Sequence, residues 1–178
     1  MDRLTEVWLD GAMNNATVID GLPRSLTIAA AVSTALVGGV LFGFSSFVMP
    51  ALRRLPPRDG LVAMQSINRA APASPAFMLA LMGTAVLCVA LAVMAIAGRD
   101  KPAAPYLLAG CALYLVAIAI TAIYHVPHND ALNLVDAAAP DAGSAWRAFE
   151  TGWTAWNHVR TVAALGSAVA FVLALGAA

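Results

Sequence analysis

Four long apolar segments constrain this chain more than any other feature of its sequence. Each is close to or above the roughly 20 residues that a helix needs to cross a bilayer. No alternation of period two appears, so helices, and not the strands of a barrel, are expected to satisfy the backbone in lipid. The segments run from about Ser25 to Val48, Pro75 to Ala97, Ala103 to Tyr124 and Asn157 to Ala177. The sequence therefore predicts an all-α, multi-pass integral membrane protein, placed in the inner membrane if its source is bacterial.

Composition supports this class and excludes others. Of the 178 residues, 61% are hydrophobic and 11% are charged, and the mean hydropathy is +0.78, which is far outside the range of soluble domains. Ten basic residues balance ten acidic ones, so charge gives no argument for a nucleic-acid partner. The lipid bilayer is the partner that composition implies.

The expected architecture is an antiparallel four-helix bundle. The second and third segments are joined by only five residues, 98–102, which favours antiparallel neighbours. Residues 1–24 are expected to form an interfacial or disordered extension, and residues 25–178 the transmembrane domain. Lysine and arginine placement favours the end that joins segments one to two and three to four as cytoplasmic, by six residues to four.

Two short helices are expected between the spans. One is amphipathic and starts near Arg58, with Leu61 and Met64 directed to the bundle or the bilayer. Gln65 and Asn68 fall near the same apolar face, where they either face a polar cavity or indicate a rotated helix with solvated amides. The other helix precedes the fourth span and is expected to be capped by Asp141 or Ser144.

The first span contains a small-xxx-small pair, Gly39 and Gly43. Small residues at this spacing let two helix backbones approach closely in lipid. Packing within the bundle is the default interpretation, and a homo-oligomer is left open.

Polar side chains gather at the start of the fourth span. On a helix that turns by about 100° per residue, Trp153, Trp156, Asn157 and Arg160 share one face, and His158 points away from Asn157. An arginine this close to hydrocarbon is costly unless it pairs, snorkels or lines a wet cavity. The alternative is an interfacial anchor, with tryptophans at headgroup depth.

An even number of spans brings further polar residues to the same end of the bundle. A seam along the third span, Tyr114, Thr121 and His125, leads to it. All three histidines of the chain are expected at this end, together with several amides. Polar residues at membrane depth are candidates for function by default, so this end is the predicted site.

Five motifs give the chain a resemblance to a known family. They are 39–44 leading to 48–52, then 64–69, then 127–130, then 156–160. In this order and spacing the chain resembles the anthrone oxygenase family of small four-helix membrane proteins, long known as a domain of unknown function. The resemblance runs from about the first span to the end of the chain. By position, the family's recurring polar residues correspond here to Asn68, Asn129, Trp156, Asn157 and Arg160.

The resemblance implies a membrane oxidoreductase, a monooxygenase that converts an anthrone-type polycyclic phenol to a quinone with molecular oxygen and needs no cofactor. Deprotonating an anthrone makes an electron-rich anion that passes an electron to oxygen directly, so the protein needs a base and donors for the oxyanion. The catalytic candidates are His128 and His125 as base, since imidazole titrates near neutrality, with Asn157 and Arg160 as donors. The substrate-binding candidates are Asn68, Asn129, Trp153 and Trp156, the tryptophans by stacking.

Two other classes remain open. Copper or haem iron is one, with His125, His128 and His158 as metal ligands, because imidazole suits both metals. A non-catalytic scaffold that binds quinone or lipid is the other. The enzyme hypothesis predicts large losses when His128 or Asn157 is replaced, whereas the scaffold hypothesis predicts none.

Overall fold

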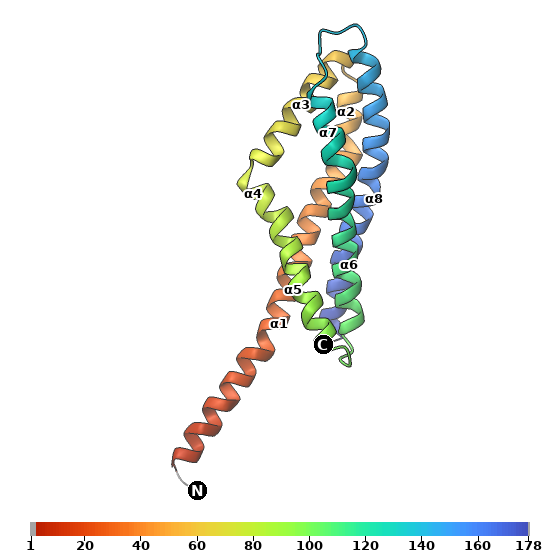
Figure 1. The fold of residues 1–178 in the computed structure, drawn as a ribbon. Helices are drawn as coiled ribbons and strands as arrows, with labels where there is room; N and C mark the ends of the chain where they lie inside the picture. Colours follow the sequence, from red (N-terminus) through yellow and green to blue (C-terminus); the bar gives the residue numbers. More distant parts are fainter. Residues whose placement is uncertain (1–2, 178) are drawn as a thin grey trace.

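The computed structural model describes the backbone of residues 3–177 and the side chains of residues 23–177. Within that part every regular element is helical. The four predicted spans are confirmed, and they run Pro23–Arg53, Pro75–Ala97, Ala104–Asn133 and Ala142–Gly176. They alternate in direction, so the antiparallel bundle is confirmed as well (Figure 1).

Three of the spans are built from two helices joined by a wide π-helical turn. In chain order the elements are α1 (Arg3–Gly43), η1 (Phe44–Val48), α2 (Met49–Arg53), α3 (Pro57–Ala73), α4 (Pro75–Met78), η2 (Leu79–Gly83), α5 (Thr84–Ala97), α6 (Ala104–Ile120), η3 (Thr121–His125), α7 (Val126–Asn133) and α8 (Ala142–Gly176). π-Helical turns are rare and occur mostly as single bulges inside α-helices, frequently at functional sites.

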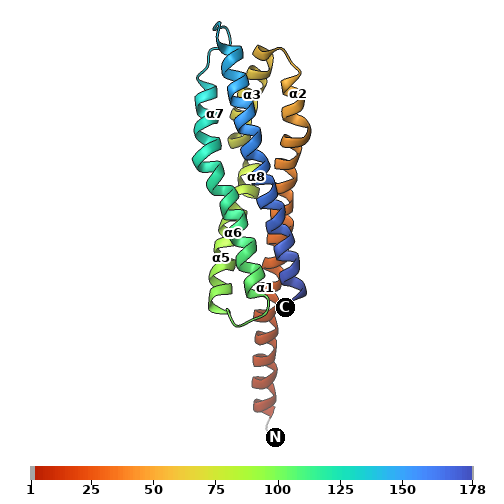
Figure 2. The ribbon, with the colours of Figure 1, turned by 90° about the vertical axis from the view of Figure 1, so that its right-hand side faces the viewer.

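The fourth span, α8, is a single uninterrupted helix against which the bundle assembles. It packs along α1 on one side and α6 on the other, as Figure 2 shows. The helix predicted ahead of this span is present, but it runs straight into the span instead of forming a separate element. Asp141 precedes its first turn without making a side-chain capping bond.

The amphipathic helix predicted between the first two spans is confirmed as α3, which buries Leu61 and Met64. It packs closely at its start, because a Cβ added to Gly60 would lie 2.9 Å from the carbonyl oxygen of Leu52 and 3.0 Å from the Trp146 ring. Only a residue without a side chain allows α2, α3 and α8 to meet at this distance.

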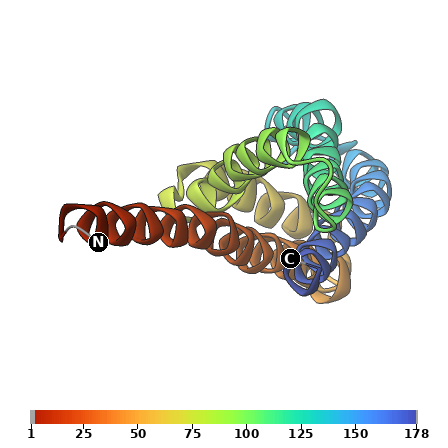
Figure 3. The same cartoon turned by 90° about the horizontal axis from the view of Figure 1, so that it is seen from below.

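The first helix begins at Arg3 and continues without a break into the first span, and its early turns extend beyond the bundle in Figures 1 and 3. The prediction of an interfacial or disordered extension over 1–24 stays a prediction, since residues 1–2 and all side chains before 23 lie outside the described part.

Two apolar clusters fill the bundle. One contains Val37, Leu91, Tyr114 and Phe171; the other, at the end where α3 joins, contains Met64, Trp146, Phe149 and Trp153. On α8 the second cluster ends at Trp153, and the first cluster begins at Ala164. The polar residues of α8 between these positions are therefore held between two apolar clusters.

Candidate active site

The centre of the site is a hydrogen-bonded pair on one face of α8, Asn157 and Arg160. Asn157 is 0% exposed and Arg160 6%. Arg160 Nη2 donates to Asn157 Oδ1 at 2.5 Å, which the spacing of three residues permits on one helical face. Trp153, Asn157 and Arg160 of the predicted face are therefore buried in the bundle, whereas Trp156 is exposed. The continuation of this face through Ala164, Ser167 and Phe171 is buried too.

The first span holds the amide of Asn157 in place. Asn157 Nδ2 donates to the carbonyl oxygen of Leu41 at 2.8 Å and to Ser45 Oγ at 2.7 Å. Ser45 belongs to the π-helical turn η1. Because the amide nitrogen is engaged on α1 and η1, its oxygen is fixed toward Arg160.

The guanidinium of Arg160 has no carboxylate partner. Among the side chains of residues 23–177, the one ion pair is Arg53 with Glu150, at 2.8 Å. Arg160 Nη1 instead donates to Thr121 Oγ1 at 3.1 Å, and Arg160 Nε is buried with no hydrogen-bond partner. A buried cation with an unused donor is costly, and it is well suited to hold an oxygen atom that develops negative charge.

Trp153 forms one wall beside this cation. The Arg160 guanidinium carbon lies 5.5 Å from the centroid of the Trp153 ring, within the range of a cation–π contact. Trp153 Nε1 donates to Asn129 Oδ1 at 2.9 Å, and Phe44 packs against the same indole with ring centroids 5.8 Å apart. Asn129 therefore orients the tryptophan, and the predicted pair Trp153 and Asn129 is brought together with Arg160.

His125 is the one histidine inside the bundle. It is 1% exposed and stands edge-on to Trp153, with ring centroids 5.1 Å apart. Its Nε2 lies 3.3 Å from the carbonyl oxygen of Trp153, and its Nδ1 lies 3.5 Å from that of Ile120. Both contacts are long, so the ring is positioned in the site without a short hydrogen bond that would hold either nitrogen.

His128 lies outside the bundle. It is exposed, its Nδ1 is 2.7 Å from the Tyr124 carbonyl oxygen, and its ring stacks on Tyr124 at 3.9 Å. Trp156 is 43% exposed and packs against the outer side of Tyr124. The sequence placed His128 and Trp156 with the other candidates, but the structure separates them as an aromatic group on the outer surface.

The three histidines are not brought together. His158 is exposed and points away from Asn157, as its position on the helix predicts. Among the described side chains, no three of histidine, cysteine, aspartate and glutamate are arranged to hold a metal ion. The set His125, His128 and His158 is therefore not assembled as a metal site in this conformation.

The two amides of α3 are buried, so the alternative of solvated side chains is wrong. Gln65 Nε2 donates to the carbonyl oxygens of Leu132 and Val135, both at 2.9 Å, and so ties α3 to the end of α7. Asn68, one turn further, is 8% exposed and its Nδ2 has no partner. Asn68 is thus a second unused donor on the side of α3 that packs in the bundle.

Sequence reasoning missed two members of the site. Ser45 and the carbonyl group of Leu41 receive the amide of Asn157, yet a serine and a leucine in an apolar span give no signal of their own. Thr121 was placed on the polar seam, but its bond to Arg160 could not be seen from the sequence. The one signal that the sequence offered for these contacts was the presence of polar residues on the spans that face α8.

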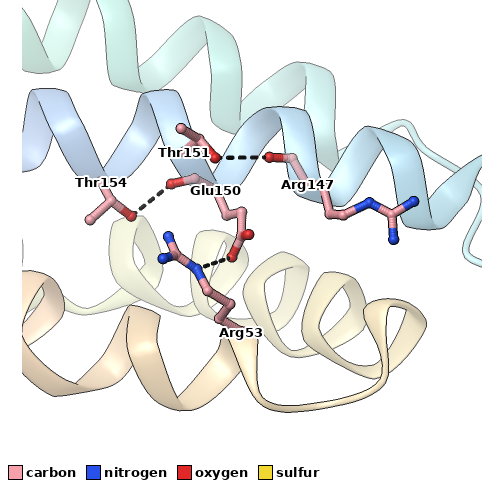
Figure 4. Close-up of polar contacts among 5 residues, drawn as sticks. All are labelled: Arg53, Arg147, Glu150, Thr151 and Thr154. Carbon is pink, nitrogen blue, oxygen red and sulfur yellow. Dashed lines mark hydrogen bonds and ion pairs between the residues drawn. The ribbon is translucent and has the colours of Figure 1, made fainter.

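The Arg53–Glu150 ion pair fixes the first span to α8 above the site. Figure 4 shows Arg53 reaching Glu150, while Arg147, one turn away on α8, points elsewhere. Glu150 is buried and lies one turn before Thr154 and Trp153, and Thr154 Oγ1 donates to the Glu150 carbonyl oxygen at 2.7 Å. The pair therefore joins α2 to α8 at this end of the bundle.

Comparison with known proteins gives one match. The family model described as "Anthrone oxygenase" matches residues 76–170, just over half of the chain. The match contains His125, Asn129, Trp153, Asn157 and Arg160, and it does not include Ser45 or Asn68. No curated protein and no solved structure matches the chain.

Proposed function

We propose that this chain, which belongs to the anthrone oxygenase family, is a membrane-embedded oxidoreductase that converts an electron-rich, anthrone-type polycycle to a quinone with molecular oxygen. The observation that carries the proposal is the buried guanidinium of Arg160, which has an unused Nε and no carboxylate partner. Keeping a charge buried at membrane depth costs free energy. Stabilising the anion of a substrate is the role for this charge that fits the family.

The reaction balances without a further reactant. The substrate loses a proton from its central CH2 group, and the resulting anion passes an electron to oxygen. The two radicals combine to a peroxide anion, which takes back the proton to give a hydroperoxide, and this loses water. One atom of O2 becomes the new carbonyl oxygen and the other leaves as water. The site needs no resident cofactor in this proposal.

Arg160 is assigned to the oxygen of the substrate anion. Removing a proton places negative charge on the existing carbonyl oxygen, and a preorganised donor in a dry site stabilises that charge strongly. Asn157 is a positioning residue, since its oxygen accepts from Arg160 and its nitrogen is used by Leu41 and Ser45. Trp153 offers a flat surface for the polycycle, held by Asn129.

His125 is assigned as the base. It is buried beside Trp153, with Nε2 3.3 Å from the Trp153 carbonyl oxygen and Nδ1 3.5 Å from that of Ile120. In the neutral ring only one nitrogen carries a proton, so the other has a lone pair for a substrate proton. His128 is the weaker candidate, because it stands on the outer surface. A base positioned in this way contributes typically 10²–10⁴-fold to a rate.

The test uses the full chain in nanodiscs with 1,8-dihydroxyanthrone. We expect quinone to form with one O2 consumed per quinone, and ¹⁸O from labelled O2 to appear in the new carbonyl. Arg160→Met should lower kcat/KM by at least about 100-fold, the effect of losing one oxyanion donor. Arg99→Met, an exposed arginine at the other end of the bundle, is the control. Wild-type activity no greater than that of empty nanodiscs would refute the proposal.

A further inference from the structure

An apolar groove runs along the first span on the side that faces the bilayer. Its volume is about 590 Å³, which lies within the range of small-molecule sites. The groove exists because three small residues recur at every fourth position between aromatic side chains. It is lined by Ala35, Gly39 and Gly43, with Phe42, Phe44 and Phe47 beside them.

The bundle does not use this groove for its own packing. A Cβ added at Gly39 would meet no atom within 4 Å. At the neighbouring Gly38, an added Cβ would lie 2.7 Å from the Leu165 side chain of α8. Packing of Gly39 within the bundle, the default interpretation of the sequence, is therefore wrong, since Gly38 makes the close approach.

One side chain, Phe44, links the groove to the candidate active site. Phe44 lines the groove and is also in contact with Trp153, at 5.8 Å between ring centroids. The same indole lies 5.5 Å from the Arg160 guanidinium carbon. Phe44 is thus an aromatic ring that touches both the groove and the Trp153 indole.

Two independent observations indicate that a ligand belongs behind Phe44. Arg160 is only 6% exposed, and its Nε has no acceptor. The interior therefore holds a hydrogen-bond donor that is free for an acceptor group of a ligand. Phe44 is also the first residue of the π-helical turn η1. A wide turn can convert to an α-helical one with a small change of backbone, and such turns are frequent at functional sites.

We infer that this groove is the bilayer-side entrance and holding site for the substrate, with Phe44 as the gate between groove and active site. The inference rests on the proposed function and deepens it. The occupant is a planar, uncharged polycyclic aromatic molecule, because the groove is apolar and lies between aromatic rings. Such a molecule partitions into the bilayer, and it becomes charged only after it passes Phe44 and meets Arg160.

A substrate that arrives through hydrocarbon must be uncharged when it reaches the groove. The quinone product, equally apolar and planar, returns to the bilayer by the same groove.

The decisive variant is Gly39→Leu, which places a side chain in the groove at a position where an added Cβ meets no atom within 4 Å. Its matched control is Gly176→Leu, because Gly176 is the other glycine in the described part, besides Gly39, whose added Cβ would meet nothing within 4 Å. In nanodiscs we expect Gly39→Leu to raise the KM for 1,8-dihydroxyanthrone at least fivefold with kcat retained. Gly176→Leu should leave both constants unchanged.

Binding is measured separately, so that failure of this inference and failure of the proposed function are distinguishable. A diazirine-bearing anthraquinone should crosslink to residues 35–48 in wild type and in Gly176→Leu, in competition with unlabelled anthraquinone, and much less in Gly39→Leu. Crosslinking can be measured even if no anthrone is oxidised, so it tests the groove independently of the reaction. Unchanged KM and crosslinking in Gly39→Leu would overturn the entrance. A wild-type dimer that Gly39→Leu dissociates, with crosslinking elsewhere, would overturn it in favour of a second copy of the chain.

Discussion

Replacing Asn157 by leucine tests whether the interior network is what holds the first span to α8. Leucine has a similar volume, so the change removes hydrogen bonds without opening a large cavity. Three bonds are lost, two to Leu41 and Ser45 and one from Arg160. Asn157 is fully buried, so its former partners on Leu41, Ser45 and Arg160 cannot bond to water instead.

The expected loss in the free energy of unfolding follows from those three bonds. Interhelical hydrogen bonds in membrane proteins average about 0.6 kcal/mol in double-mutant cycles, and a typical buried bond contributes about 0.5–1.5 kcal/mol. Arg160 would retain only its bond to Thr121, and an under-bonded charge costs more than a neutral group. We therefore expect the free energy of unfolding to fall by about 2–4 kcal/mol.

The assay is reversible unfolding in mixed detergent and dodecyl sulfate micelles, followed by circular dichroism. Thr161→Val is the matched control, because Thr161 lies one turn away, is also buried, and donates to the Asn157 carbonyl within its own helix, at 2.8 Å. Its loss should stay below about 1 kcal/mol, since such local bonds contribute little to a helix. If the two variants lose the same free energy, the network does not join the spans.

The remaining predictions concern the charge, the base, α3 and metal. Asn157→Asp should abolish quinone formation in the nanodisc assay while losing less stability than Asn157→Leu, because a carboxylate beside Arg160 neutralises the cation that the substrate anion needs. His125→Gln should lower kcat at least about 100-fold, whereas His128→Ala should stay within about twofold of wild type, since His128 is exposed; the reverse order would refute the assignment. Gln65→Leu should lower the free energy of unfolding by about 1–3 kcal/mol, as two carbonyl groups at the end of α7 lose their donor. Elemental analysis should find no stoichiometric copper or iron that is lost in a His125→Ala/His128→Ala variant; finding it would favour a metal-dependent oxidase.

The fold was largely predictable because helix periodicity and span length are read directly from sequence. The face of α8 is the clearest case, since Asn157, Arg160 and Ser167 are all buried as predicted. Trp156 departs from that face for a simple reason. On a helical wheel it lies about 60° from the line through Trp153, at the edge of the face, and there it reaches the outer surface beside Tyr124.

The two histidines near Pro127 show why the site was only partly predictable. His125 and His128 are three residues apart, a spacing that puts two side chains on one face of a regular helix. Between them the chain leaves the π-helical turn η3 and enters α7. A π-helical turn shifts every following side chain around the axis, so His125 points into the bundle and His128 points out. No residue type marks such a turn in the sequence.

The π-helical turns and the polar residues of the spans depend on one another. A wide turn moves backbone bonds from the fourth to the fifth preceding residue, and so leaves a carbonyl group without its usual donor. In water this costs little, but in hydrocarbon the carbonyl needs another donor. Near η1, Asn157 donates to the carbonyl oxygen of Leu41, and within η2 the Tyr114 hydroxyl donates to that of Leu81 at 3.0 Å, which also accepts from the Thr84 N–H. Both side-chain donors come from other spans, so η1 and η2 gain these bonds only once the bundle has assembled. The turn at η1 in turn gives Ser45 and Phe44 the positions they hold against Asn157 and Trp153. The active site and its entrance therefore arise from tertiary contacts of the assembled bundle, and no single segment of the sequence contains them.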